Sequence, residues 1–348
     1  MYLNDLLMTS KFSIIQPPIF NKNLEMKPFQ KTKILGDDEM LESTREYLYS
    51  SNMVSEIEKF YLSFQNKYQL FDWMKKRVKT EPKIVEVNKS SNDIVVIPTA
   101  NVNGKWSKAA LDTFKGFHII FVESAKDNFF NLSHSFNVGF KLALEYSPNW
   151  IVFSNDDMIA MESPQKLREA LNKAEDTANA LFINELIYGH SYLIELGNEN
   201  LIGKVRAFSQ GRNIIRRELF ESRFGVKIKM RTAREREKYH SFKKIVSLSL
   251  TGDFGILNSA FVKKLNAKVF DETFIHGAED IDLSVRLMLA DFEPSWIDFS
   301  IGSIGGGTRG KTQIRWLKDV ANFSYLNYKL TSLLLPKIES NSYGIIYA

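Results

Sequence analysis

Two adjacent carboxylates follow a short apolar run near the middle of the chain. Trp150–Phe153 has the composition of a buried strand, and the polar turn Asn155–Asp157 comes just after it. In open α/β sheets, ligands collect in the crevice beyond the carboxyl ends of the strands. Carboxylates placed there can hold Mg²⁺ or Mn²⁺, which prefer hard oxygen ligands. Asn and Asp are also common turn residues, so this stretch alone leaves a solvated turn open.

A second acidic pair, Glu279 and Asp280, begins a stretch with the apolar spacing of a helix. Acidic residues in a first helical turn often only stabilise the helix dipole. A carboxylate fixed at that position can also act as a general base. His276 lies just before the pair and is a further candidate for contact with a bound molecule, although a lone histidine is more often structural.

Glycines interrupt an apolar run upstream of the second acidic pair. Ser247–Leu257 has a strand-like composition, but Gly252 and Gly255 lie within it. A glycine inside a strand suits the close approach of a ligand to the backbone. This run is therefore a second region in which we expect a ligand.

The elements around the first acidic pair alternate between strand and helix. Three strands and two intervening helices are predicted: Ile94–Ile97, His118–Val122 and Trp150–Phe153, with Ser107–Phe114 and Leu132–Tyr146 between them. This alternation predicts βαβ units, hence an α/β fold with a mostly parallel central sheet flanked by helices. Right-handed crossovers then bring the three strand ends to one edge of the sheet. We expect Pro98–Asn101, Glu123–Ser124 and Asn155–Asp157 to meet there, which favours a binding site over three unrelated turns.

Outside this region the patterns are mainly helical. Residues 1–90 carry apolar residues at helical spacing in Asp37–Tyr49 and Ser55–Val78, and no strand is indicated there. We therefore expect a helical N-terminal extension over 1–90, an α/β domain over 91–310 and a C-terminal helical segment over 311–348. Within the α/β domain, Pro164–Asp176 is a further predicted helix and Ala180–Ile183 a further predicted strand.

Composition restricts the class of protein. The chain has 348 residues, of which 44% are hydrophobic and 25% charged, as in soluble globular proteins. No apolar run is long enough for a transmembrane helix, and the N-terminus lacks the pattern of a signal peptide. The chain has no cysteine, which excludes disulfides and cysteine-ligated metals and is compatible with the cytoplasm, where we expect the protein.

The positive charge is concentrated in one segment. Residues 201–244 contain 14 Lys and Arg against four Glu, a local charge of +10, so the rest of the chain carries −5. A solvated insertion and a surface for an anionic partner are both open for this segment. Such a partner would be a nucleic acid, a lipid-linked phosphate or the headgroups of an anionic membrane that the protein contacts peripherally.

Taken in order, these stretches resemble the inverting, metal-dependent GT-A glycosyltransferases, in particular family 2. The resemblance runs from about Asp93 to Ile304, some three-fifths of the chain. Six motifs carry it: Pro98-Thr-Ala-Asn101, Glu123-Ser124, Asn137-Val-Gly139, Asn155-Asp-Asp157, Thr251-Gly-Asp-Phe-Gly255 and Gly277-Ala-Glu-Asp-Ile-Asp-Leu-Ser-Val-Arg286. Each motif is weak alone, whereas their order and spacing together are specific.

The resemblance implies a GT-A, Rossmann-like fold and the transfer of a sugar from a nucleotide-diphosphate sugar, a UDP- or GDP-sugar, to an acceptor hydroxyl. It implies that Asp280 is the base, beside Glu279, and that Asp157 binds a divalent cation, Mn²⁺ or Mg²⁺, on the donor diphosphate. The other implied donor-binding residues are Pro98, Thr99, Asn101, Glu123, Asn137, Asn155 and Asp156. The implied acceptor-side residues are Gly252, Asp253 and His276. The acceptor itself, a glycan, a lipid-linked molecule or a protein, is not identified.

Two departures from the family pattern bear on the metal and the donor. The first Asp of the Asp-x-Asp motif is Asn155, so a neutral amide would make the usual ribose contact. Many relatives also place a metal-binding His after the strand that follows the Glu-Asp helix, where this chain has Ile301–Gly307 without a His. Water and diphosphate would then complete the metal shell, or the dependence on metal is weak.

The glycine run that follows matches a phosphate-loop pattern. Residues 305–312 fit the P-loop spacing, but only 36 residues follow, with Asp319 their single Asp, which is too little for the rest of a P-loop fold. Glycine-rich turns still expose N–H groups that bind phosphate. Our hypothesis is that 305–312 close on the donor diphosphate with Arg309 and Lys311 supplying charge, and the alternative is a flexible linker.

Two other classes of protein compete with a glycosyltransferase. A sugar-nucleotide pyrophosphorylase would need a glycine-rich basic loop after the first strand, where this chain offers only Gly104 and Lys105. A non-catalytic protein could instead bind nucleic acid or membrane through residues 201–244. Nucleotide release from sugar donors distinguishes the glycosyltransferase from this binding protein.

Overall fold

The computed structural model describes most of the chain from Asp38 onward. The described residues are 38–124, 128–174, 178, 180–187, 193–196, 206–208, 245–248, 252–289, 295–303 and 313–339. All of them belong to one compact unit, Asp38–Ala348.

A mixed sheet of eight strands forms the centre of this unit, in the order β1-β3-β2-β4-β10-β6-β11-β5. Its strands are β1 (Lys83–Val87), β2 (Ile94–Thr99), β3 (His118–Glu123), β4 (Trp150–Ser154), β5 (Met158–Ala160), β6 (Ala180–Ile187), β10 (Phe254–Asn258) and β11 (Ser295–Ser303). The predicted parallel pairing is confirmed for β2 with β3 and β4, and β6 also pairs in parallel with β11. The other pairs are antiparallel. Strand β10 is antiparallel to both β4 and β6, and the edge strands β1 and β5 are antiparallel to their neighbours β3 and β11.

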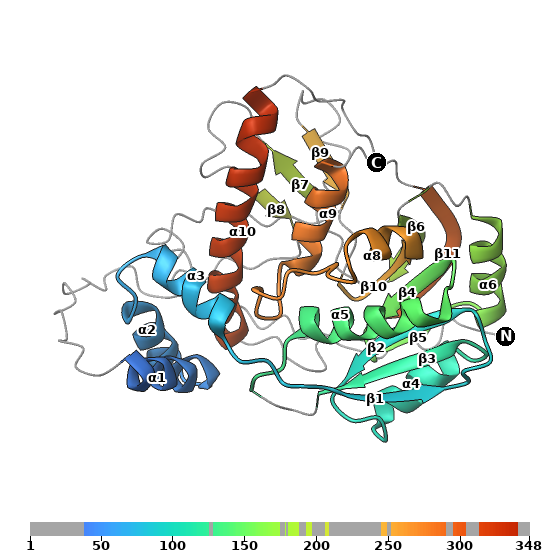
Figure 1. Cartoon of the computed structure of the whole chain (residues 1–348), viewed down its shortest axis with the longest axis horizontal. Helices are drawn as coiled ribbons and strands as arrows, with labels where there is room; N and C mark the ends of the chain where they lie inside the picture. Colours follow the sequence, from blue (N-terminus) through green and yellow to red (C-terminus); the bar gives the residue numbers. More distant parts are fainter. Residues whose placement is uncertain are drawn as a thin grey trace, which may run out of the picture. The chain divides into compact units, whose positions relative to one another are not determined.

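Helices cover both faces of the sheet (Figure 1). They are α4 (Lys105–Thr113), α5 (Leu132–Ala143), which continues as the 3₁₀ turn η2 (Leu144–Tyr146), α6 (Pro164–Lys173) and α8 (Ser259–Lys264). Strand β2 shows the arrangement: Ile94 and Val96 pack in the core with α5, whereas Val95 and Ile97 pack in the core with α4 and α6. Burial of both faces explains why β2 is apolar from Ile94 to Pro98 and does not alternate with polar residues. The chain is therefore an α/β protein with a mixed sheet flanked by helices.

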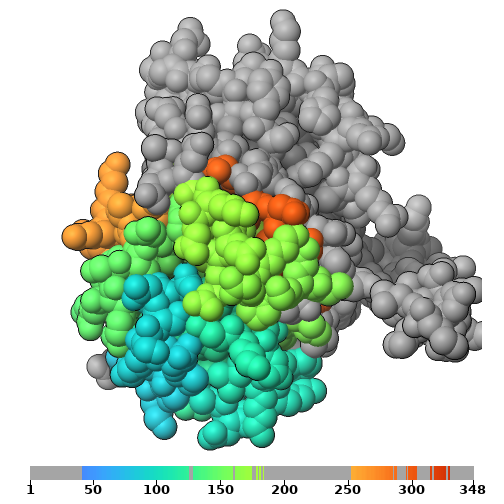
Figure 2. Space-filling view, turned by 90° about the vertical axis from the view of Figure 1, so that its right-hand side faces the viewer, coloured from blue at the N-terminus to red at the C-terminus, as the bar shows by residue number. Residues whose placement is uncertain are grey.

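Helix α5 approaches the sheet closely because of a glycine. A Cβ atom on Gly139 would lie 2.2 Å from Val96 Cγ1 and 3.0 Å from Val122 Cγ2. Only glycine allows the backbone of α5 to lie this near β2 and β3. In Figure 2, the segments coloured from cyan to yellow-green, which include α4, α5 and α6, form one continuous surface.

The run Ser247–Leu257 is not one strand, contrary to its composition. Its first part lies in β9 (Ile245–Leu248), which joins β7 (Leu193–Leu196) and β8 (Arg206–Phe208) in a separate sheet of order β8-β7-β9. Its last part is β10 in the central sheet. Of the basic segment 201–244, only Arg206–Phe208 is described, so its predicted partners stay predictions.

The helical patterns before residue 90 correspond to three helices packed on the C-terminal one. They are α1 (Asp38–Ser50), α2 (Val54–Leu62) and α3 (Lys67–Lys76), and the C-terminal helix is α10 (Gln313–Glu339). Their shared apolar cluster includes Phe60, Phe64, Trp73 and Leu317. The Tyr61 hydroxyl donates to Leu317 O (2.5 Å) and accepts from Ala321 N–H (3.0 Å).

Two details in this region differ from the sequence prediction. Ser55–Val78 is divided into α2 and α3, because the Asn66 side chain accepts hydrogen bonds from Tyr68 N–H and Gln69 N–H and so caps a new helix. Strand β1 was not indicated because it is a short edge strand with partly exposed residues. In the described part of the chain, no helix is long and apolar enough to cross a membrane.

Candidate functional site

The carboxyl ends of β2, β3 and β4 meet, as the alternation of strands and helices predicted. Ser124 N–H donates to Thr99 O (3.1 Å), which joins the ends of β3 and β2. The Thr99 hydroxyl donates to Asp156 Oδ2 (2.7 Å), which joins the ends of β2 and β4. Val102 N–H donates to Glu123 Oε1 (3.0 Å), so the β3 carboxylate also holds the loop after β2. The three polar strand ends therefore form one site.

The loop between β2 and α4 is a tight polar turn. Thr99 Oγ1 lies 2.9 Å from Ser107 Oγ, and the Ser107 hydroxyl donates to Asn101 O (2.8 Å). Asn101 Oδ1 accepts from Asn103 N–H (2.9 Å), and a Cβ on Gly104 would lie only 2.9 Å from Asn101 O. Asn101 thus shapes the turn with its own side chain.

Every residue of β2 is buried, including Pro98 and the last residue, Thr99. At the carboxyl end of β2, the Thr99 side chain contacts Asp156. Of the donor residues expected on β2, Pro98 and Thr99 are buried and Asn101 is exposed.

Strand β10 joins the site through Asn155. Its backbone N–H donates to Asp253 O (2.8 Å), and its side-chain Nδ2 donates to Asp253 Oδ1 (2.9 Å). The amide that was expected to contact a ribose therefore holds the turn before β10. This contact places Asp253 and the preceding Gly252 beside the end of β4.

Helix α9 (Glu279–Leu289) begins at the predicted acidic pair and brings Asp280 to Gly252. Gly252 N–H donates to Asp280 Oδ2 (3.0 Å), and Ile281 N–H donates to Asp280 Oδ1 (2.8 Å). The residue is only 7% exposed. These two bonds fix the carboxylate and use two of about four acceptor positions on it, so a bound hydroxyl can still donate to it.

The turn before α9 is strained at two positions. His276 and Ala278 have φ angles of 58° and 70°, in the left-handed region that non-glycine residues rarely adopt. The His276 ring packs edge-on against Phe130, with centroids 5.1 Å apart. The described contact of the His276 ring is with Phe130, and its expected contact with an acceptor stays a prediction.

Burial raises the proton affinity of the site's carboxyl groups. Burial raises the pKa of Asp280. The hydrogen bonds from Gly252 N–H and Ile281 N–H lower this pKa in part, and the charge of Asp253 raises it further. Burial likewise raises the pKa of Glu279, to which Asp280 and Asp319 add. Burial raises the pKa of Asp156 too, against the opposing hydrogen bond from Thr99. A carboxyl whose pKa moves toward neutrality is suited to proton exchange with a bound hydroxyl.

Asn137 serves a different purpose from the donor contact that the resemblance implied. Its Nδ2 donates to Phe270 O (2.8 Å) and Glu272 Oε1 (3.0 Å), and its Oδ1 accepts from Phe270 N–H (3.1 Å). With both hydrogens of the amide nitrogen used and its oxygen bonded, the side chain anchors the segment between α8 and α9. Its surroundings do not support a donor contact.

Gly255 also differs from expectation. A Cβ at this position would lie 2.3 Å from Phe153 Cζ, so glycine is required by the packing of that ring and not by a ligand. Gly252 has more space, because a Cβ there would meet Asp280 Oδ2 at 3.6 Å.

The described residues do not by themselves make a complete cation site. Among them, no group of three His, Asp or Glu side chains is placed to hold a metal ion. Asp156 is hydrogen-bonded to Thr99, and Asp157, the ligand that the resemblance implies, lies just before β5. Arg309 and Lys311 lie outside the described residues.

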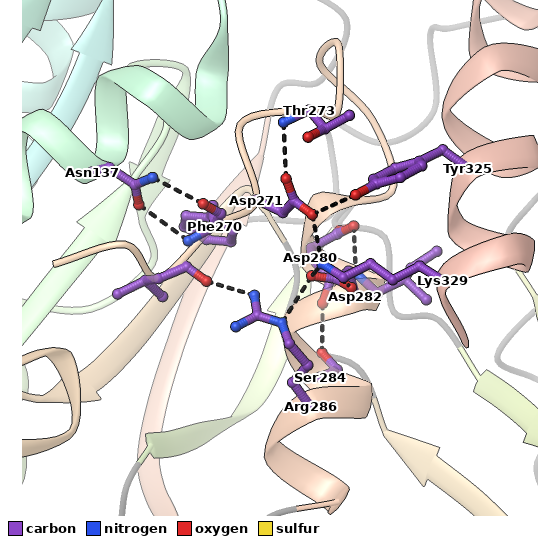
Figure 3. A network of polar contacts seen from close by, with 12 residues as sticks. Asn137, Phe270, Asp271, Thr273, Asp280, Asp282, Ser284, Arg286, Tyr325 and Lys329 are labelled. Carbon is purple, nitrogen blue, oxygen red and sulfur yellow. Dashed lines mark hydrogen bonds and ion pairs between the residues drawn. The ribbon is translucent and has the colours of Figure 1, made fainter. Parts of the chain in front are cut away.

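The sequence patterns did not predict a cluster of polar side chains that joins α9 to α10 (Figure 3). It consists of Asp271, Asp282, Arg286, Tyr325 and Lys329, joined by hydrogen bonds and ion pairs. Tyr325 and Lys329 belong to α10, and their distance along the chain from α9 hides the cluster from any local motif.

Comparison of the chain with protein-family models and with curated proteins gave no match. The functional argument therefore depends on the arrangement of the side chains and on the motifs of the sequence.

Proposed function

We propose that this protein is a glycosyltransferase that moves a sugar from a nucleotide-diphosphate sugar to an acceptor hydroxyl, with Asp280 as the general base. We also propose that the α/β domain is of the GT-A type and that α1–α3 are an N-terminal extension to it. The resemblance of the six motifs suggests this reaction, and the geometry of the described residues supports it.

One observation carries the proposal: a continuous contact path joins the strand ends to the buried base. The path runs through three hydrogen bonds, namely Thr99 to Asp156, Asn155 to Asp253 and Gly252 to Asp280. Because the residues between these bonds are neighbours in the chain, the path has no break. A ligand lying along it would have one end at the carboxyl ends of β2 and β4 and the other at Asp280.

In the proposed reaction, Asp280 removes the proton of the acceptor hydroxyl while that oxygen attacks the anomeric carbon of the donor. The bond between the anomeric carbon and the diphosphate oxygen breaks, the electron pair leaves with the diphosphate, and the proton remains on Asp280. Attack from the face opposite the leaving group inverts the anomeric centre. Thr99, Glu123 and Asp156 shape the end of the site where we place the donor nucleotide.

We keep Asp157 as the proposed ligand of a divalent cation, because it is the last carboxylate of the Asn155-Asp-Asp157 motif that carries the resemblance. When bound, such a cation would neutralise charge on the diphosphate. Since the described residues do not complete its coordination shell, we assign it no step of the reaction.

The proposal is tested by incubating the purified protein with a panel of UDP- and GDP-sugars, with Mn²⁺ or with a chelator, and measuring free nucleotide. We expect slow nucleotide release from one donor, faster with an acceptor, and its loss in Asp280→Asn. The proposal would be refuted if no donor of the panel released nucleotide and no donor stabilised the protein against thermal unfolding. Formation of a sugar nucleotide from a nucleoside triphosphate and a sugar phosphate would favour a pyrophosphorylase instead.

A further inference from the structure

Lys329 of α10 forms two ion pairs, which Figure 3 draws together with Asp280. Its ammonium nitrogen lies 2.6 Å from Asp271 Oδ2 and 2.9 Å from Asp282 Oδ1. Asp271 belongs to the segment between α8 and α9, and Asp282 lies in the first turn of α9. The Asp282 side chain is fully buried and those of Lys329 and Asp271 are 20% and 22% exposed. Salt screens charges sheltered in this way only weakly.

Further contacts bind the same three parts of the chain together. The Tyr325 hydroxyl of α10 donates to Asp271 Oδ2 (3.0 Å). Arg286 Nε donates to Asp282 Oδ2 (2.9 Å), and its terminal nitrogen donates to Val269 O (2.6 Å). Burial opposes the ionisation of Asp271, but the Lys329 ammonium outweighs it and holds the pKa of Asp271 at about 2. Asp271 is therefore an anion at neutral pH, and the pair with Lys329 is charged.

The position of α9 matters because its two sides have different contacts. Two residues along an α-helix are rotated by about 200°, so Asp280 and Asp282 point to nearly opposite sides. Asp280 contacts Gly252, whereas Asp282 contacts Lys329. A shift of α9 relative to α10 would therefore move the Asp280 carboxylate relative to Gly252.

We propose that Lys329 is a positioning residue for Asp280: by bridging Asp271 and Asp282, it holds the first turns of α9 in place and so sets the position of the base. This inference rests on the proposed glycosyl transfer. It gives the C-terminal helix a part in the reaction, although α10 contributes no residue to the contact path.

Lys329→Met should lower kcat by about 10- to 100-fold, because a misplacement of about 1 Å can slow a reaction by that much. The donor KM should stay unchanged, since the proposed donor residues lie at the ends of β2, β3 and β4, which Lys329 does not contact. Lys329→Arg keeps the charge and should recover most of kcat. A matched control is Arg168→Met, which removes a part-buried pair of 2.7 Å to Asp93, just before the amino end of β2. It should reduce stability without changing kcat.

A double variant separates positioning from stability. In Lys329→Met, Asp271 loses its cation, whereas Asp282 keeps its ion pair with Arg286. Adding Asp271→Asn removes the unpaired charge. If Lys329 positions the base, the double variant regains thermal stability while kcat stays low. If the double variant regains the wild-type kcat, or if Arg168→Met lowers kcat as much as Lys329→Met does, the inference is wrong.

Hydrogen exchange of the full-length protein without donor tests the same inference independently of activity. In Lys329→Met, amides of 279–289 should exchange roughly tenfold faster, which corresponds to about 1.4 kcal/mol. Amides of 94–99 should not change, and those of 279–289 should not change in Arg168→Met. If the wild type transfers no sugar, the proposed function fails, but faster exchange would still support a role of Lys329 in holding α9. Unchanged exchange in α9 would overturn the inference whatever the activity.

Discussion

Replacing Asp280 by Asn tests the proposed base with little change of shape. Asp280 accepts hydrogen bonds from Gly252 N–H and Ile281 N–H, one at each carboxylate oxygen. Asn keeps only one acceptor oxygen, so one of these buried or part-buried N–H groups loses its partner. The free energy of unfolding should fall by about 1–3 kcal/mol for that reason. The neutral amide offsets part of this, since burial disfavours the ionised carboxylate and raises the pKa of Asp280.

The expected effect on the reaction is larger. Loss of a general base typically lowers the rate by about 10²–10⁴-fold, which raises the activation barrier by roughly 2.7–5.4 kcal/mol. Donor affinity should be retained, because Asp280 lies at the far end of the contact path from Thr99 and Asp156. The raised pKa also predicts that wild-type kcat/KM falls with decreasing pH well before an ordinary carboxyl would become protonated. The Asn variant should lack this acid limb.

The assay is nucleotide release at saturating donor and varied acceptor concentration, which gives both kcat and kcat/KM, measured from pH 5 to 9 well below the unfolding temperature. Asp93→Asn is the control, because it removes a partly buried carboxylate near the opposite end of β2. A rate for Asp280→Asn within about tenfold of wild type would refute the assignment of the base. So would an unchanged acid limb in the variant.

Three further results are expected. Gly139→Ala should lower the free energy of unfolding by about 1–3 kcal/mol in urea titrations, because the new Cβ would lie 2.2 Å from Val96 Cγ1. Gly252→Ala should lower it less, because a Cβ at that position has room. Equal effects of the two substitutions would contradict this packing. Asp271→Asn should cost roughly 2 kcal/mol of unfolding free energy near pH 6, since the folded-state pKa of Asp271 is about 2 against an ordinary value of 3.8. That difference should be complete above pH 3.8 and vanish as the pH falls through about 2, and its persistence in acid would contradict the ion pairing. Asp157→Ala should abolish any effect of Mn²⁺ on donor affinity measured by calorimetry, and a Mn²⁺ effect equal to that of the wild type would remove Asp157 as the ligand.

The part of the fold that could be predicted from the sequence is the part built from local patterns. Apolar, β-branched runs of strand length separated by helical spacing gave β2, β3 and β4 and their parallel order. Chain geometry then required their carboxyl ends to meet, and Thr99, Glu123 and Asp156 do meet. The start of α9 at Glu279 was also readable, because acidic residues in a first turn and the apolar spacing after them are local signals.

The rest depended on contacts between distant segments. Nothing in the run Ser247–Leu257 shows that its two ends belong to different sheets, or that β10 enters antiparallel between β4 and β6. Asn137 was linked to the donor by the resemblance and Gly255 to a ligand by its residue type, but their neighbours Phe270 and Phe153 explain them. Such neighbours are 98–133 residues away along the chain and leave no periodic pattern.

The packing of α1–α3 on α10 has a consequence for how the chain is made. Tyr61 and Leu317, which are hydrogen-bonded, are separated by 256 residues. At about 5–20 residues per second, a ribosome needs roughly 10–50 s to synthesise the intervening chain. During that time Phe60, Phe64 and Trp73 lack the helix that covers them. Helices α1–α3 are therefore synthesised early, but their packing is completed only when α10 has been made. A nascent chain that stalls before α10 presents an uncovered aromatic surface to chaperones and to other nascent chains.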